Sequence, residues 1–206
     1  MTGIRTVVAH FCTLAVCGVL LGAFYEQFAG TVLPCPLCIL QRMAMILCAA
    51  GPAWVLILST RREVGPLDYA RGYGASILAA VLGAAISGRQ VLLHIMPGDP
   101  GYGGAVMGWH LYTWAFVVFV VVIVVSGLHL MLGLPSREER LPWPRLSATV
   151  FLVLVLVTAA NAISVFALAG LHLFLTDDPT SYRLFEDLGW SSTSAGTATA
   201  PAGIGD

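Results

Sequence analysis

Long apolar stretches alternate with short polar connections along this chain, and the pattern predicts five membrane-spanning helices. Each stretch reaches the roughly 20 residues that an α-helix needs to cross the hydrocarbon core of a bilayer. Helices are the expected form because backbone polar groups in lipid must be satisfied within their own segment. The fold class is therefore all-α, a polytopic membrane helix bundle. The predicted spans are 7–28, 39–59, 69–94, 109–132 and 146–175.

Composition supports the membrane class. Of the 206 residues, 58% are hydrophobic and only 10% are charged, whereas a soluble domain carries about 25% charged residues. The first apolar stretch has no cleavage pattern and is longer than the apolar core of a signal peptide, so we expect it to remain as an anchor. Membrane lipid is the expected surroundings. A nucleic-acid partner is not expected, because no basic patch is present.

The positive charges predict how the chain crosses the membrane. There is no lysine, so arginines alone mark the cytoplasmic side. The connections 29–34 and 95–108 contain no arginine, and we place them and the C-terminal tail outside the cytoplasm. The N-terminus is then cytoplasmic. The arginines that mark the cytoplasmic ends are Arg5, Arg61, Arg62, Arg137, Arg140 and Arg145.

The most informative motif is Cys35-Pro36-Leu37-Cys38, at the start of the second span. Two intervening residues let both sulfurs turn to one side, and we predict that they lie within disulfide reach. A thiolate at a helix N-terminus is stabilised by free N–H groups and by the helix dipole. The alternatives are a static disulfide or half of a metal site. A four-cysteine zinc site is not expected, because the other cysteines lie within spans as packing residues: Cys12, Cys17 and Cys48.

Other polar residues in apolar surroundings each allow two interpretations. Arg42 follows Cys38 by one helical turn, and its guanidinium either reaches back to the interface or contacts a carbonyl oxygen of a quinone. Glu26 is either a proton carrier for quinone reduction or a solvated interface residue. Asn161 is expected to bond across to a neighbouring helix. Five histidines allow a haem or metal hypothesis, but no tight ligand spacing links them, so no metal ligand is assigned.

Residues 27–42, QFAGTVLPCPLCILQR, resemble the signature of the DsbB family of quinone-linked disulfide-generating membrane proteins. The resemblance implies a four-helix core in the cytoplasmic (inner) membrane of a bacterium. It implies that Cys35 exchanges disulfides with a thioredoxin-fold, DsbA-like extracytoplasmic partner and that Cys38 lies next to a quinone, either ubiquinone or menaquinone. The residues implied to contact the quinone are Arg42, Gln41, Gln27 and His94, with Gln90 near the same end of the third span.

Two features depart from the family pattern. The connection 95–108 lacks the second cysteine pair of typical members, so a partner meets Cys35 directly, another protein supplies the pair, or the chain serves a different redox task. A fifth span and a tail follow the four-helix core. The expected organisation is a DsbB-like core at 1–134, a cytoplasmic loop and fifth helix at 135–176, and an extracytoplasmic, partly disordered tail at 177–206.

The predicted function is therefore that of a membrane thiol–disulfide oxidoreductase. Electrons would pass from a partner dithiol through Cys35 and Cys38 to a membrane quinone. The main alternative is a non-catalytic subunit that keeps the DsbB-like scaffold and binds a membrane protein complex through its fifth helix and tail. A haem or metal membrane protein is the third hypothesis.

Overall fold

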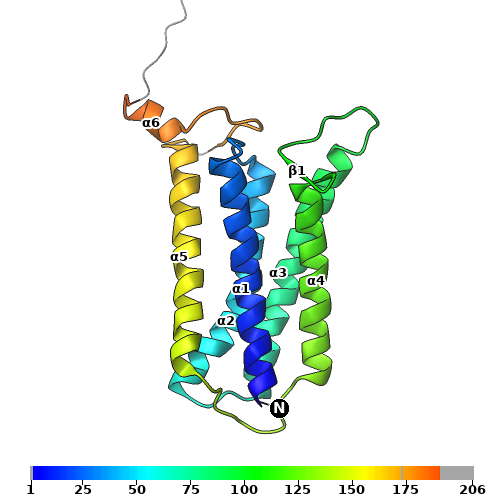
Figure 1. Cartoon of the computed structure of the whole chain (residues 1–206), viewed down its shortest axis with the longest axis vertical. Coiled ribbons are helices and arrows are strands. Elements are labelled where there is room, and N and C mark those ends of the chain that lie inside the picture. The colour runs from blue at the N-terminus through cyan, green and yellow to red at the C-terminus, as the bar shows by residue number, and fades with distance from the viewer. Residues whose placement is uncertain (1, 173, 191–206) are drawn as a thin grey trace, which may run out of the picture.

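Five long helices run side by side along the molecule (Figure 1). The computed structural model describes residues 2–172 and 174–190. Each of the five helices is long and apolar enough to cross a membrane, which confirms the polytopic helix bundle. Two short strands, β1 (Ala105–Val106) and β2 (Trp109–His110), and a short helix, α6 (Arg183–Asp187), lie at one end. The long helices are α1 (Thr2–Phe28), α2 (Pro36–Arg61), α3 (Pro66–Leu93), α4 (Leu111–Leu132) and α5 (Pro144–Ala169).

Several helices begin or end at other residues than the predicted spans. Helices α2, α3 and α5 each begin at a proline, earlier than the apolar stretch, because proline is pre-organised for the first helical position. Trp109 was predicted to begin the fourth span but lies in strand β2. The fifth span was predicted to reach residue 175, but α5 ends at Ala169 because Gly170 has a positive φ of 62°.

Helix α2 lies at the centre of the bundle, in contact with α1, α3 and α5. Its closest approach is to α3, where Gly51 faces Gly72. A Cβ atom on Gly51 would lie 2.1 Å from the Gly72 carbonyl oxygen, so only glycine permits this packing. Helix α5 packs against α2 and α1 and lies on the other side of the bundle from α4 (Figure 1). The fifth helix is thus part of the same bundle as the first four.

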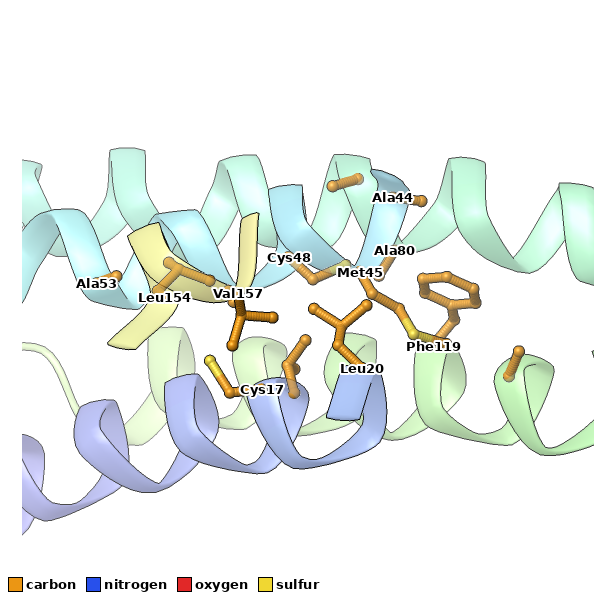
Figure 2. Close-up of a cluster of buried hydrophobic side chains, with 14 residues drawn as sticks. Cys17, Leu20, Ala44, Met45, Cys48, Ala53, Ala80, Phe119, Leu154 and Val157 are labelled. Carbon is orange, nitrogen blue, oxygen red and sulfur yellow. The ribbon is translucent and has the colours of Figure 1, made fainter. Parts of the chain in front are cut away.

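The core between these helices contains two of the cysteines outside the motif. Cys17 of α1 and Cys48 of α2 are buried among Leu20, Met45 and Phe119 (Figure 2). This confirms that they are packing residues. Cys12 is half-buried at the margin of the bundle.

One prediction about helix packing is wrong. Asn161 was expected to bond across to a neighbouring helix, but its Nδ2 donates to the Val157 carbonyl of its own helix, at 2.9 Å. The carbonyl four residues earlier is within easy reach of a short polar side chain. Its Oδ1 has no hydrogen-bond partner among residues 2–172 and 174–190.

At the end of the bundle opposite α6, Glu139 ties together segments that are distant in sequence. Its carboxylate accepts hydrogen bonds from Arg5, at 2.9 Å, and from Tyr69, at 3.1 Å. Its backbone pairs with Val64 in the connection between α2 and α3. These contacts join α1, α3 and the connections 62–65 and 133–143 at the end of the bundle opposite the CxxC motif.

Candidate functional site

The two cysteines of the motif begin helix α2. Cys35 is the N-cap residue, with an extended backbone at φ −69° and ψ 166°, and its Sγ accepts a hydrogen bond from the Cys38 backbone N–H at 3.2 Å. Pro36 occupies the first helical position, where no N–H is needed. The sulfur of Cys35 therefore takes the place that a Ser or Asp oxygen usually has at a helix start. Both thiols are free in this structure.

The side chain of Gln90, on α3, lies against both sulfurs and is itself held by Gln41 of α2. Gln90 is only 2% exposed, and its Nε2 lies 3.5 Å from Cys35 Sγ and 3.8 Å from Cys38 Sγ. Its Oε1 accepts a hydrogen bond from Gln41 Nε2 at 2.7 Å, which fixes the amide with its nitrogen toward the sulfurs. One nitrogen thus contacts both sulfurs. The sulfurs of Cys35 and Cys38 therefore face the same side of the helix start, as a disulfide between them would require.

The guanidinium of Arg42 points into the bundle instead of toward the interface. The residue is 9% exposed. Its Nη1 donates to Gln27 Oε1 at 2.7 Å and its Nη2 to the Ala23 carbonyl at 2.9 Å, both on helix α1. The charge lies 5.3 Å from the centre of the Phe24 ring. The interpretation that Arg42 reaches back to the interface is therefore wrong, and its contact with a quinone stays a prediction.

A cavity of about 400 Å³ lies beside Cys38 and Arg42. A volume of this size is typical of sites for small molecules. The walls come from α1, α2, α4 and the connection between α3 and α4, and they are mainly apolar. Gln41 and Glu26 add polar groups to the wall, whereas Cys35 does not line the cavity. A ligand in the cavity would therefore meet one sulfur of the pair and one positive charge.

The connection 95–108 covers this end of the site. Tyr102 donates its hydroxyl hydrogen to the Leu33 carbonyl at 2.6 Å, just before the CxxC motif, and also lines the cavity. Burial raises the pKa of Tyr102 further above its ordinary value, which already keeps the hydroxyl protonated at neutral pH. Cys35 is only 6% exposed. A hydrogen bond with Cys38 and burial raise the pKa of the Cys35 thiol, which favours the protonated form of this residue.

Of the four residues predicted to contact a quinone, Arg42 and Gln41 line the cavity, whereas Gln27 and His94 do not. His94 lies instead against the connection that follows α3. Its Nδ1 lies 3.0 Å from Asp99 Oδ1, and its ring stacks on Tyr112 with centroids 5.5 Å apart. The Gly101 backbone N–H and His94 hold the pKa of the Asp99 carboxyl below its usual value. The imidazole thus orders the loop. The polar residue of α3 that reaches the sulfurs is Gln90, one turn earlier.

Two further predictions concern Glu26 as a proton carrier and the histidines as metal ligands. Glu26 lines the cavity, as a proton carrier would have to. In the part of the chain that the structure describes, no three His, Cys, Asp or Glu side chains are grouped so that they could hold a metal ion.

Two contributors to the site were not predicted from the sequence. Gln27 Nε2 donates to Ser164 Oγ at 2.8 Å and to Tyr182 Oη at 2.9 Å. Ser164 lies on α5 and Tyr182 just before α6. No motif or spacing links these two residues to the cysteines, so only the folded arrangement brings them together.

The fold and the site define a class: a multi-pass helical membrane protein with a CxxC dithiol at the N-terminus of its central helix and a cavity of about 400 Å³ beside the second sulfur. The DsbB family model, "Disulfide bond formation protein DsbB", matches residues 5–102. This match contains α1, α2, α3 and the start of the connection that follows.

Curated relatives agree with that match. The chain is 32% identical over 149 residues to "Disulfide bond formation protein B 1" of Pseudomonas fluorescens strain Pf0-1, which covers 58% of this chain and 82% of the relative. It is 36% identical over 89 residues to "Disulfide bond formation protein B" of Hahella chejuensis, covering 43% of this chain and 51% of the relative. The protein of that name from Methylococcus capsulatus is 42% identical over 83 residues, covering 39% and 48%.

The chain therefore belongs to the DsbB family. It spans about half the length of the Hahella and Methylococcus relatives and most of the Pseudomonas relative. No solved structure matches it.

We predict that mild oxidation of the purified protein joins Cys35 to Cys38 and leaves the other cysteines as thiols. The two sulfurs face one amide nitrogen at the end of the bundle, whereas Cys17 and Cys48 are buried in the core. Peptide mass spectrometry after alkylation would identify the pair, with Cys38→Ala as the control that cannot form it. A disulfide that joins either residue to a core cysteine would contradict this geometry.

Proposed function

We propose that this protein is a quinone-linked thiol–disulfide oxidoreductase of the bacterial cytoplasmic membrane. It would take electrons from the dithiol of an extracytoplasmic thioredoxin-fold protein and pass them to a membrane quinone, ubiquinone or menaquinone. The observation that carries the proposal is that only one of the two cysteines lines the cavity. Cys38 shares the wall of the 400 Å³ cavity with Arg42, while Cys35 lies outside that wall.

The cavity has the features that a quinone ring requires. Most of its lining is apolar, and the guanidinium of Arg42 and the amide of Gln41 are the hydrogen-bonding groups of α2 on its wall. Arg42 would donate to a ring oxygen and stabilise negative charge that develops there. Glu26 on the same wall would supply a proton. A bound quinone would act as the acceptor of two electrons and two protons.

The exchange step would use the oxidised pair. A thiolate of the partner attacks Cys35 Sγ, the bond between Cys35 and Cys38 breaks, and Cys38 leaves as a thiolate beside the N-terminus of α2 and the charge of Arg42. The second thiol of the partner then attacks the mixed disulfide. The products are an oxidised partner and a reduced Cys35–Cys38 pair, whose two electrons go to the acceptor in the cavity.

Access to Cys35 requires movement of the covering loop. The residue is buried, and Tyr102 holds the loop to the segment before the motif. A partner that binds directly would have to displace this contact, since residues 95–108 contain no cysteine pair to act as an intermediate carrier. We propose direct exchange at Cys35 as the way in which this chain works without that pair.

The orientation of the chain in the membrane is proposed from the positions of its arginines. Arg5 and the arginines near Glu139 lie at the end opposite the motif, and short connections rich in arginine favour the cytoplasm. The CxxC motif and α6 would then be extracytoplasmic. A role of the fifth helix and tail in binding a membrane complex stays a prediction.

Replacing Arg42 tests the quinone side of the proposal. We expect Arg42→Ala to raise the apparent KM for a short-chain ubiquinone by roughly 10- to 100-fold, the effect of losing a charged hydrogen bond. Dithiothreitol would serve as the electron donor, and quinone reduction would be followed by ultraviolet absorbance. The matched control is Arg89→Ala, because Arg89 is an exposed arginine near the same end of the bundle. Unchanged kinetics in Arg42→Ala would reject the contact between Arg42 and the quinone.

Replacing Cys38 tests the dithiol side. In cells that express Cys38→Ala, Cys35 has no internal partner, so a partner thiol that reacts with it should accumulate as a mixed disulfide. Non-reducing electrophoresis and mass spectrometry would detect the adduct, and the Cys35→Ala, Cys38→Ala double variant should lack it. If no adduct forms, and loss of both cysteines leaves the cellular role intact, the non-catalytic subunit hypothesis is the correct one.

A further inference from the structure

The position of Arg42 depends on the orientation of one buried amide. Gln27 is 2% exposed, so its amide finds partners only within the protein. Its oxygen accepts from Arg42, and its nitrogen donates both hydrogens, one to Ser164 Oγ and one to Tyr182 Oη. A guanidinium cannot accept a hydrogen bond, and the two hydroxyls can. Because Arg42 can only donate, the carbonyl oxygen of Gln27 must face it, and the two hydroxyls hold this orientation by accepting the hydrogens of the amide nitrogen.

Both hydroxyls belong to the part of the chain that follows the four-helix core. Ser164 lies on α5, which packs against α1 and α2. Tyr182 is the residue before α6, and α6 is attached to the end of α5. Asp187 accepts from the Leu171 backbone N–H at 3.0 Å. The Tyr182 hydroxyl is thus brought to the redox site by a docked segment.

We propose that Ser164 and Tyr182 are positioning residues for Arg42, so that the fifth helix and the start of the tail form part of the redox site. Without their hydroxyls, the Gln27 nitrogen loses both acceptors, and the amide can turn away. Arg42 then loses a 2.7 Å hydrogen bond and its fixed place beside the cavity. The expected effect on quinone rests on the proposed function. The expected effect on the Cys38 thiol does not need a quinone, because Cys38 is within electrostatic range of Arg42.

The first measurement is a double-mutant cycle in quinone reduction by the full-length protein. Tyr182→Phe and Ser164→Ala each remove one hydroxyl, and we expect each to raise the apparent KM for the short-chain ubiquinone by about fivefold, the effect of one hydrogen bond. In an Arg42→Ala background the same changes should have no further effect, because the group that they position is absent. An equal rise in both backgrounds would show a general loosening of the fold and overturn the proposal.

Two control variants remove hydroxyls that have no link to Gln27. Ser181→Ala loses a hydrogen bond to Glu186 within the tail segment. Ser147→Ala removes a buried hydroxyl at the other end of α5, where it contacts His10. Both should keep the parent KM. If either raised the KM as much as Tyr182→Phe, the effect would not run through Gln27, and the proposal would be wrong.

The second measurement needs no quinone. In the reduced protein, the rate of Cys38 alkylation is measured against pH by peptide mass spectrometry. We expect the midpoint of this profile to rise in the Ser164→Ala, Tyr182→Phe double variant, because a displaced guanidinium no longer stabilises the thiolate. If the parent protein reduces no quinone, the proposed function fails and this profile alone decides the positioning role. An unchanged midpoint would overturn it.

Discussion

A buried positive charge is the constraint on which the rest of this structure depends. A guanidinium in apolar surroundings is costly unless hydrogen bonds replace its hydration. Arg42 meets that requirement with the Gln27 side chain and the Ala23 carbonyl of α1. The need to keep Gln27 in place then involves α5 and the segment before α6. A single charge one turn after Cys38 therefore connects three helices and the tail.

The start of α2 determines how the two cysteines differ. Pro36 and the extended Cys35 begin the helix, so Cys35 caps it and Cys38 falls in its first turn, where unpaired N–H groups and the dipole favour a negative charge. The same register turns Cys38 toward the cavity and leaves Cys35 behind it, beneath the loop that Tyr102 fastens. Two chemically identical thiols thus acquire different surroundings, one on the wall of the cavity and one outside it.

Much of the fold follows from the sequence because lipid imposes simple requirements on a chain. The five spans were predicted from apolar length alone, and the place of Cys35 and Cys38 from one motif. The helix ends were less accurate, since they depend on local features such as the positive φ of Gly170. The prediction that Asn161 bonds to a neighbouring helix was wrong, because its side chain reaches a carbonyl of its own helix.

The site itself was predicted only in part, for a physical reason. Gln41 and Arg42 follow Cys38 on the same helix, so their place near it follows from sequence spacing, whereas Gln27 lies on α1 and reaches the site through its hydrogen bond with Arg42. His94 was expected at the cavity, but an aspartate in the next loop pairs with it. Ser164 and Tyr182 are common residues with no spacing relation to the motif. Their contact with Gln27 exists only through tertiary packing.

The most direct test of the account is the visible spectrum of the purified protein with quinone added. A thiolate next to a quinone ring produces a charge-transfer band, and the account predicts such a band in Cys35→Ala protein, where Cys38 is an unpaired thiol on the cavity wall. The band should be absent from Cys38→Ala protein under the same conditions. A band that persists without Cys38, or a haem Soret band in place of it, would contradict the assignment of Cys38 as the residue that faces the quinone.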